Sequence, residues 1–175
     1  PQLSEAWLFD NCEYSRYFSA DKEKQFIANK SLEFIAPKDW SVEKKNRGDV
    51  SSVLVSSGSP CEIKAYITTR KLDSRETGVS RNQLLSMMLQ SSIDHLESQD
   101  REIIDKGAFD GFGINVSSYV IVSGKRGQQY PVLNYGGVSE RRNIGLTIQS
   151  DLKDRRNDIA SIIKDFVSTI KINYN

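Results

Sequence analysis

The sequence predicts an α+β domain, with a curved antiparallel β-sheet and two main amphipathic helices packed on it. Apolar residues recur at helical spacing in residues 80–98 and again in residues 154–170. Between these two segments the pattern alternates with period two, which is typical of strands. The order helix, β-meander, helix therefore accounts for the second half of the chain.

The first half of the chain shows the pattern of β-strands. Residues 25–28 and 31–36 are separated by Asn29-Lys30, a spacing that predicts a hairpin. Pro37 ends that run, because proline cannot donate a ladder hydrogen bond. The other elements expected here are strands at 40–43, 50–56 and 62–69, a polar loop at 57–60 and a polar link at 71–79.

The first predicted helix begins at Ser80 and ends near Gln99. Ser80 and Gln83 match a capping box, in which the hydroxyl accepts a free N–H and the amide reaches back. Arg81 belongs to the polar face of this helix. The apolar stripe consists of Leu84, Leu85, Met88, Leu89, Ile93 and Leu96.

The β-meander that follows is expected to turn at glycines. We expect one turn at residues 123–127 and another at Gly136-Gly137, because glycine adopts the positive φ of tight turns. The strands of the meander are expected at 103–107, 114–122, 130–135 and 144–148.

The closing helix is capped by Asp151 or Asp154, whose carboxylate accepts free N–H groups and meets the positive end of the helix dipole. Its buried stripe consists of Ile159, Ile162, Ile163, Phe166, Val167 and Ile170.

Composition fits one globular domain, for which we expect an N-terminal arm at 1–24 and a single α+β domain at 25–175. The 24 basic and 23 acidic residues give a net charge of +1, so charge does not indicate nucleic acid as a partner. No run of 18 apolar residues occurs, and we expect no transmembrane segment.

The two cysteines, Cys12 and Cys61, lie among polar residues and permit one disulfide bond. Such a bridge would join the arm to the strand at 62–69 and contribute about 4 kcal/mol in the chain-entropy model. The chain begins at Pro1, as expected after removal of a signal or for a trimmed chain. We expect a periplasmic or otherwise exported protein; the alternative is a cytoplasmic protein with two free thiols.

The sequence contains no recognisable catalytic or cofactor motif. His95 is the single histidine, and no G-x-S-x-G element accompanies it. One histidine and two distant cysteines are too few for a zinc centre, so we expect no metal and no cofactor. Asp105 and Asp110 leave open a carboxylate pair that assembles only in three dimensions.

The segment Phe34-Ile-Ala-Pro-Lys-Asp-Trp40 and the order of the elements across residues 25–172 resemble the PsbP-like fold family. This family includes the extrinsic photosystem II subunit PsbP, a nuclear-transport factor and various bacterial exported proteins. The resemblance implies a sheet with helices packed on its faces, and binding, mostly of other proteins, more often than catalysis.

Aromatic residues concentrate in the arm, and aromatic side chains are enriched at protein interfaces. Two interpretations stay open: the aromatics fold back as a lid over the core, held by the Cys12 bridge, or the arm, or the sheet face beside it, docks a partner protein. The candidate residues of the arm are Trp7, Phe9, Tyr14, Tyr17 and Phe18. A second candidate surface on the meander consists of Tyr130, Tyr135, Arg141 and Arg142.

The function predicted from these observations is that of a non-enzymatic protein-binding module. We expect it in the bacterial envelope or a secretion system, as an accessory factor, a chaperone or a toxin inhibitor (immunity protein). A first alternative is a lumenal or lipoprotein-type domain that binds a small ligand or stabilises an assembly, which an apolar cleft between helix and sheet would favour. A second alternative is a hydrolase with a carboxylate pair in a deep pocket.

Overall fold

The structure, a computed structural model, describes residues 21–58, 62–114, 116–123, 131–150 and 157–173. The helices are α2 (Ser74–Thr77), α3 (Arg81–Ser98) and α4 (Asn157–Thr169). The strands are β1 (Lys22–Ile27), β2 (Leu32–Pro37), β3 (Ser41–Arg47), β4 (Val50–Ser56), β5 (Ile63–Lys71), β6 (Ile103–Ala108), β7 (Ser117–Val122), β8 (Val132–Val138), β9 (Arg142–Ser150) and β10 (Lys171–Ile172).

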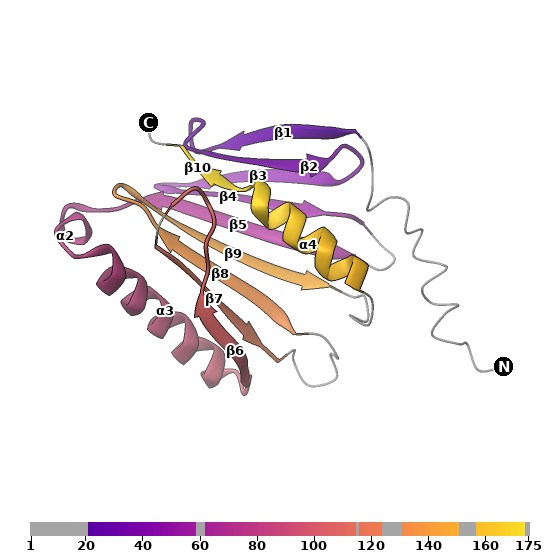
Figure 1. Cartoon of the computed structure of the whole chain (residues 1–175). Coiled ribbons are helices and arrows are strands. Elements are labelled where there is room, and N and C mark those ends of the chain that lie inside the picture. The colour runs from indigo at the N-terminus through magenta and orange to yellow at the C-terminus, as the bar shows by residue number, and fades with distance from the viewer. Residues whose placement is uncertain (1–20, 59–61, 115, 124–130, 151–156, 174–175) are drawn as a thin grey trace.

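The strands form two antiparallel sheets (Figure 1). The larger sheet has seven strands in the order β3-β4-β5-β9-β8-β7-β6. The smaller sheet has the order β1-β2-β10, so the last strand of the chain pairs with the N-terminal hairpin. The predicted fold class, an antiparallel sheet with two main helices packed on it, is confirmed.

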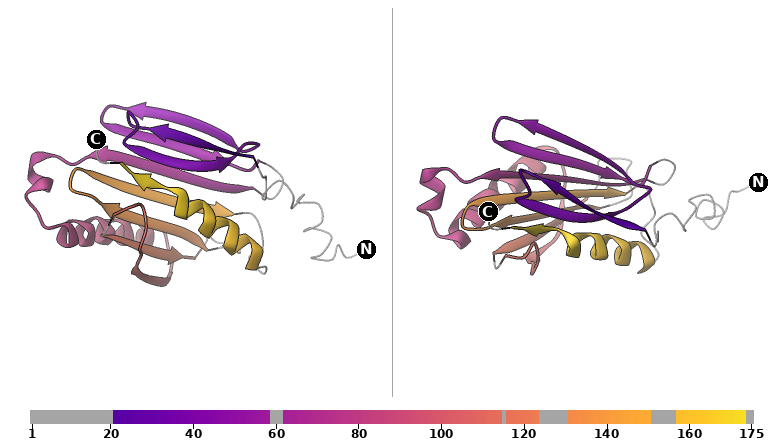
Figure 2. Two further views of the ribbon diagram at one scale, coloured as in Figure 1. Left: turned by 45° about the horizontal axis from the view of Figure 1, so that its top comes forward. Right: turned by 90° about the horizontal axis from the view of Figure 1, so that it is seen from above.

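The two long helices lie on opposite faces of the seven-stranded sheet (Figure 2). Neighbouring glycines in β8 show this, because successive residues of a strand point to opposite faces. A Cβ built on Gly136 would lie 3.8 Å from Leu85 Cδ1 of α3. A Cβ built on Gly137 would instead meet Ile114 and Phe112, which belong to the core cluster that also contains α4.

The main hydrophobic core lies on the α4 side, between the large sheet, α4 and the small sheet. Phe166 of α4 packs against Phe34 and Trp40, each with ring centroids 6.3 Å apart. The buried residues of α4 are Ile162, Ile163, Phe166 and Val167, followed by Ile170. These five confirm the part of the predicted stripe that the structure describes.

On the other face, α3 packs mainly against β7 and β8. Ser80 Oγ accepts the N–H of Gln83 at 3.2 Å, which confirms the predicted N-cap. Arg81 was expected on the polar face of α3. In the structure, its guanidinium group instead anchors the start of the helix through hydrogen bonds. It donates to five carbonyl oxygens, those of Glu76, Thr77, Val79, Ser139 and Glu140.

The predicted turn at Gly136-Gly137 is wrong, because both glycines lie inside β8. Gly136 pairs with Gly145 of β9 and with Ser118 of β7. The chain turns instead after β8, where Ser139 Oγ accepts the N–H groups of Arg141 and Arg142. At these two positions of β8, glycine leaves the strand without a side chain and does not reverse the direction of the chain.

Two short elements were not predicted. Helix α2 interrupts the expected polar link at 71–79 and begins with a capping box between Asp73 and Glu76. Strand β10 has two residues, too few for a periodic pattern. Strand β1 begins at Lys22, so residues 22–24 of the expected arm pair with β2. The predicted caps Asp151 and Asp154 lie outside the described residues.

Candidate functional site: a cleft beneath helix α3

The core beneath α3 is divided into two clusters. The cluster near the start of α3 contains Leu72, Leu84, Leu85 and Val138. The cluster near its end contains Ile93, Val120, Val122 and Val132. Between the two clusters, a cleft of about 270 Å³ lies between the helix and the sheet. The helix therefore contacts the sheet at both ends and leaves a space beneath its middle.

The sheet register explains why the floor of this cleft is hollow and polar. One row of cross-strand neighbours runs Ser118–Gly136–Gly145–Thr68. The adjacent row runs Val120–Asn134–Thr147–Tyr66. The two glycines contribute no side chain at the centre of the floor. The surrounding side chains of the cleft are the hydroxyls of Ser118, Thr68 and Thr147, the amide of Asn134 and the apolar side chain of Val120. The wall is apolar and consists of Leu85, Met88, Leu89, Ile93 and Leu96 of α3.

Two polar atoms of the floor are buried and have no hydrogen-bond partner among the described residues. Thr147 Oγ1 donates to Asn134 Oδ1 at 3.2 Å, but Asn134 Nδ2 has no acceptor. Ser118 is 7% exposed, and its Oγ also lacks a partner. Its neighbour Ser117 points to the opposite face, where its hydroxyl donates to the carbonyl of Phe109. Because buried polar groups are usually paired, the two unpaired atoms at the cleft need an explanation.

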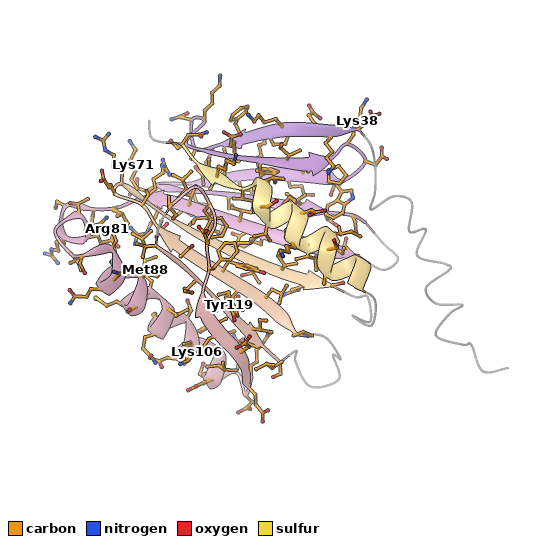
Figure 3. All side chains as sticks on the ribbon, in the orientation of Figure 1. Lys38, Lys71, Arg81, Met88, Lys106 and Tyr119 are labelled. Carbon is orange, nitrogen blue, oxygen red and sulfur yellow. The ribbon has the colours of Figure 1, made fainter. Side chains whose placement is uncertain are left out.

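A second, more open cavity of about 580 Å³ adjoins the cleft and shares Met88, Ser92 and Asn143 with its lining. Met88 and Arg81 both belong to α3 (Figure 3). The wall of this outer cavity includes the ion pair of Arg70 and Glu76, with two contacts of 2.6 and 2.7 Å. The hydrogen bonds from Arg70, with that from the Asp73 N–H, lower the pKa of Glu76 to about 2.

On the same face of the sheet as α3, strands β4 and β5 carry exposed side chains. Helix α3 lies away from these two strands (Figure 1). Tyr66 of β5 is 47% exposed and Val50 of β4 is 37% exposed. Leu54 is the cross-strand neighbour of Tyr66 and is half-buried. The edge strand β3 adds the exposed side chains of Lys45 and Arg47. These five residues, Tyr66, Val50, Leu54, Lys45 and Arg47, are called the open face below.

The predicted meander surface is only partly accessible among the described residues. Arg141 is exposed in the turn between β8 and β9. Arg142 is 8% exposed, burial lowers its pKa, and its Nη1 donates to Thr69 Oγ1 at 3.3 Å. Tyr135 is half-buried, its ring packs on Phe109 at 4.9 Å, and burial raises its pKa.

The remaining predicted site residues lie outside the described residues, and their roles stay predictions. They are Trp7, Phe9, Tyr14, Tyr17, Phe18 and Tyr130, together with the possible disulfide partners Cys12 and Cys61.

The other candidates for chemistry lie apart from the cleft. His95 is exposed near the end of α3, and its ring is 3.2 Å from Gln99 Nε2. Asp105 accepts a hydrogen bond from the Tyr119 hydroxyl at 3.0 Å, which raises the pKa of that tyrosine. Within the described part of the chain, no group of three or more His, Cys, Asp or Glu residues is arranged to hold a metal ion. Among these same residues, no helix is long and apolar enough to cross a membrane.

The arrangement of elements defines an α+β domain in which one antiparallel sheet separates a helix and a small sheet from a second helix. It is similar to the solution structure of cyanobacterial PsbP (CyanoP) from Synechocystis sp. PCC 6803, with a TM-score of 0.59 and 16% identity. The match covers 88% of this chain and 94% of that chain. The chain thus has a PsbP-like fold, as the sequence resemblance predicted. No family model and no curated protein sequence matches it.

Sequence reasoning missed Ser118, Asn134 and Tyr66. The polar residues that interrupt apolar alternation in β7 and β8 were a usable signal, because a strand facing a helix is expected to be apolar there. Tyr66 alternates with buried Ala65 and Ile67, and this pattern already places it on the other face.

Proposed function

We propose that this chain is a non-enzymatic binding domain that docks another protein through the open face. The observation that supports this proposal is the exposure of Tyr66, at 47%, beside Leu54 and Val50. Large exposed tyrosines surrounded by polar side chains are typical of protein interfaces, where they act as anchors. In the bacterial envelope, such a domain would serve as an accessory factor, a chaperone or a toxin inhibitor.

The charges around Tyr66 favour a partner with an acidic surface. Lys45 and Arg47 are exposed on β3. Lys64 is exposed beside Tyr66 on β5, but its ammonium group already pairs with Glu62 at 3.0 Å. Glu43 lies in the same cross-strand row as Leu54 and Tyr66 and is the one acidic side chain of β3. A partner that places an apolar side chain on Tyr66 and carboxylates near Lys45 and Arg47 would complement this surface.

Docking by strand addition at the edge of β3 is disfavoured. Strand β3 forms one edge of the large sheet and carries Lys44, Lys45 and Arg47 in succession with Asn46. Charged residues, lysine especially, protect edge strands from pairing with other chains. The side-chain face is therefore the better docking surface, and specificity would come from charge and from Tyr66.

The proposal is tested by placing a photo-reactive phenylalanine analogue at position 66 of the full chain in its native cells. We expect one discrete adduct, which weakens with rising salt and is lost in the Lys45→Glu, Arg47→Glu double variant. The matched control is position 104, because Ile104 is 59% exposed on β6. Equal adducts from both positions, or an adduct that ignores salt and charge reversal, would contradict the proposal.

The compartment is tested separately by mass spectrometry of thiols, with and without reductant, on protein taken from its native source. A bridge between Cys12 and Cys61 supports the envelope, because disulfides persist in oxidising compartments. Two free thiols favour a cytoplasmic adaptor that docks its partner through the same open face.

A further inference from the structure

We infer that the cleft beneath α3 binds a small, uncharged, mainly apolar molecule that carries a hydrogen-bond acceptor such as an ester or amide carbonyl. Three properties of the cleft lead to this class of ligand: its apolar wall, its two unpaired polar atoms and its lack of charged lining residues. The site adjoins the open face, because Tyr66 is the cross-strand neighbour of Thr147, but Tyr66 is not one of the residues that line the cleft.

The size and the wall of the cleft suit an apolar body. An apolar cavity of about 150 Å³ in a protein can hold benzene, and this cleft measures about 270 Å³. Leu85, Met88 and Leu89 form part of the wall, and Gly136 contributes no side chain to the opposite surface. Beside it, the Thr68 hydroxyl lies 3.1 Å from the position that a Cβ of Gly145 would take. Ligand sites are commonly lined in this way, by apolar side chains with a few placed polar groups.

The two unpaired polar atoms would recognise the acceptor. Asn134 Nδ2 is a donor without an acceptor, and its Oδ1 is already fixed by Thr147. The amide is therefore oriented before any ligand arrives. Ser118 Oγ can donate to the same acceptor, since Ser118 and Asn134 lie on the neighbouring strands β7 and β8. A ligand carbonyl here would pair groups whose burial is otherwise unfavourable.

The lining of the cleft disfavours a charged ligand. None of the described residues that line the cleft is Asp, Glu, Lys, Arg or His. An ionised ligand would lose its hydration without gaining an opposite charge, which is far more costly than burying a carbonyl. The nearest ion pair, Arg70 with Glu76, lies in the outer cavity, where its charges already satisfy each other.

The outer cavity offers the ligand a path. It shares Met88 and Ser92 with the cleft, and Met87 on its rim is 58% exposed. Methionine side chains are unbranched and adapt to different shapes, which suits a passage that opens and closes around a ligand.

Three probes of similar shape test the inference on the full chain: methyl benzoate, benzoate and isopropylbenzene. Binding is measured by NMR titration, with the side-chain NH₂ signal of Asn134 as the reporter of the hydrogen bond. We expect methyl benzoate to bind and shift that signal. Isopropylbenzene should bind about fivefold more weakly, because it lacks the acceptor and loses one hydrogen bond. Benzoate should bind at least about tenfold more weakly, because its carboxylate loses its hydration without gaining an opposite charge.

Substitutions locate the site. Gly136→Val should abolish binding, because a Cβ there already lies 3.8 Å from Leu85 and the two methyl groups fill the floor. Its matched control is Gln149→Val, which adds the same side chain at an exposed position of β9 and should bind as the unaltered chain does. Ser118→Ala should keep the fold and reduce the preference for methyl benzoate over isopropylbenzene about threefold.

The inference is overturned if benzoate binds as well as its methyl ester, if Gly136→Val leaves binding unchanged, or if none of the three probes shifts signals beneath α3. If Gly136→Val fails to fold, the inference is tested with Ser118→Ala, by the ratio of its affinities for methyl benzoate and isopropylbenzene. Cross-linking at position 66 measures a different surface, so either proposal can fail alone.

Discussion

The two faces of the seven-stranded sheet are made by the same strands, but they are packed differently. The face toward α4 carries one continuous core with Phe34, Phe112 and Phe166. The face toward α3 carries two small clusters, with Ser118 and Asn134 in the gap. Because side chains alternate along a strand, each face is specified independently. One face can therefore hold the fold together while the other keeps unpaired polar groups and a cavity.

The largest effect is expected in the continuous core. Phe166→Ala should lower the free energy of unfolding by about 3–5 kcal/mol, since the cavity would lie between Phe34, Trp40 and the sheet. Ile93→Ala beneath α3 should cost about 2 kcal/mol, because the helix there can settle toward the sheet. Denaturant unfolding of both variants measures the contrast. Equal losses would show that the two faces are equally well packed.

The next largest effect on stability is expected from the hydrogen bonds of Arg81, which anchor the start of α3. Arg81→Met should cost about 3 kcal/mol, because five carbonyl oxygens lose a charged donor. Arg81→Lys should recover little, since an ammonium group cannot span carbonyls of both α2 and the β8–β9 turn. Hydrogen exchange should show α3 amides opening while those of α4 stay protected. Loss of protection in both helices would contradict this separation.

A smaller effect on stability is expected at the ion pair that lines the outer cavity, apart from both hydrophobic cores. The pKa of Glu76 is about 2, below its ordinary value of 4.5, so its pair with Arg70 stabilises the fold fully above about pH 4.5. This contribution is lost progressively as the pH falls from 4.5 through about 2, the pKa of Glu76 in the folded state. Glu76→Gln should cost about 1–2 kcal/mol at pH 7, less than the full shift because solvent screens the pair.

Denaturant unfolding of the Glu76→Gln variant at pH 7 and at pH 2 tests this contribution. The loss should be much smaller at pH 2, where about half of the Glu76 carboxyls are protonated in the folded state. Glu97→Gln, at an exposed position of α3, is the control and should change little at either pH. A loss for Glu76→Gln that is the same at both pH values would exclude the ion pair as its cause.

The smallest expected effect on stability compares two adjacent serines of β7 that point to opposite faces of the sheet. Ser117 and Ser118 are adjacent in β7 and similarly buried, but one hydroxyl is paired and the other is not. Ser117→Ala should cost about 1 kcal/mol, because the Phe109 carbonyl loses its donor. Ser118→Ala should cost nothing or stabilise slightly. Thermal unfolding of the pair measures the difference, and equal losses would mean that Ser118 has a partner after all.

Much of the fold was predictable because long periodic segments dominate it. The apolar stripe of α3 and its cap at Ser80 have the expected period and position, and strand β4 spans the predicted residues 50–56. The turn predicted at Gly136-Gly137 was wrong, because the sequence does not distinguish a glycine in a turn from a glycine that makes room beneath a helix. The short elements α2 and β10 depend on a local cap and on distant pairing, and neither produces periodicity.

The candidate site was less predictable than the fold. Ser118 and Asn134 are ordinary residues in the sequence, and their meaning depends on the register that places them on neighbouring strands beneath α3. Arg142 shows the opposite case, because it was predicted at a partner surface and is buried against Thr69. Whether it contacts a partner stays a prediction, as does the role of the aromatic residues in the arm.

The pairing of β10 with β2 has a consequence for synthesis. Ile172 pairs with Leu32, so the hairpin of β1 and β2 gains its third strand only after residue 172, some 140 residues later in the sequence, has been translated. Contacts between residues so distant in sequence form slowly, because a long loop must close first. The small sheet is therefore expected to be completed only after β10 has emerged from the ribosome, and a chaperone that holds the β1–β2 hairpin or β10 would delay it.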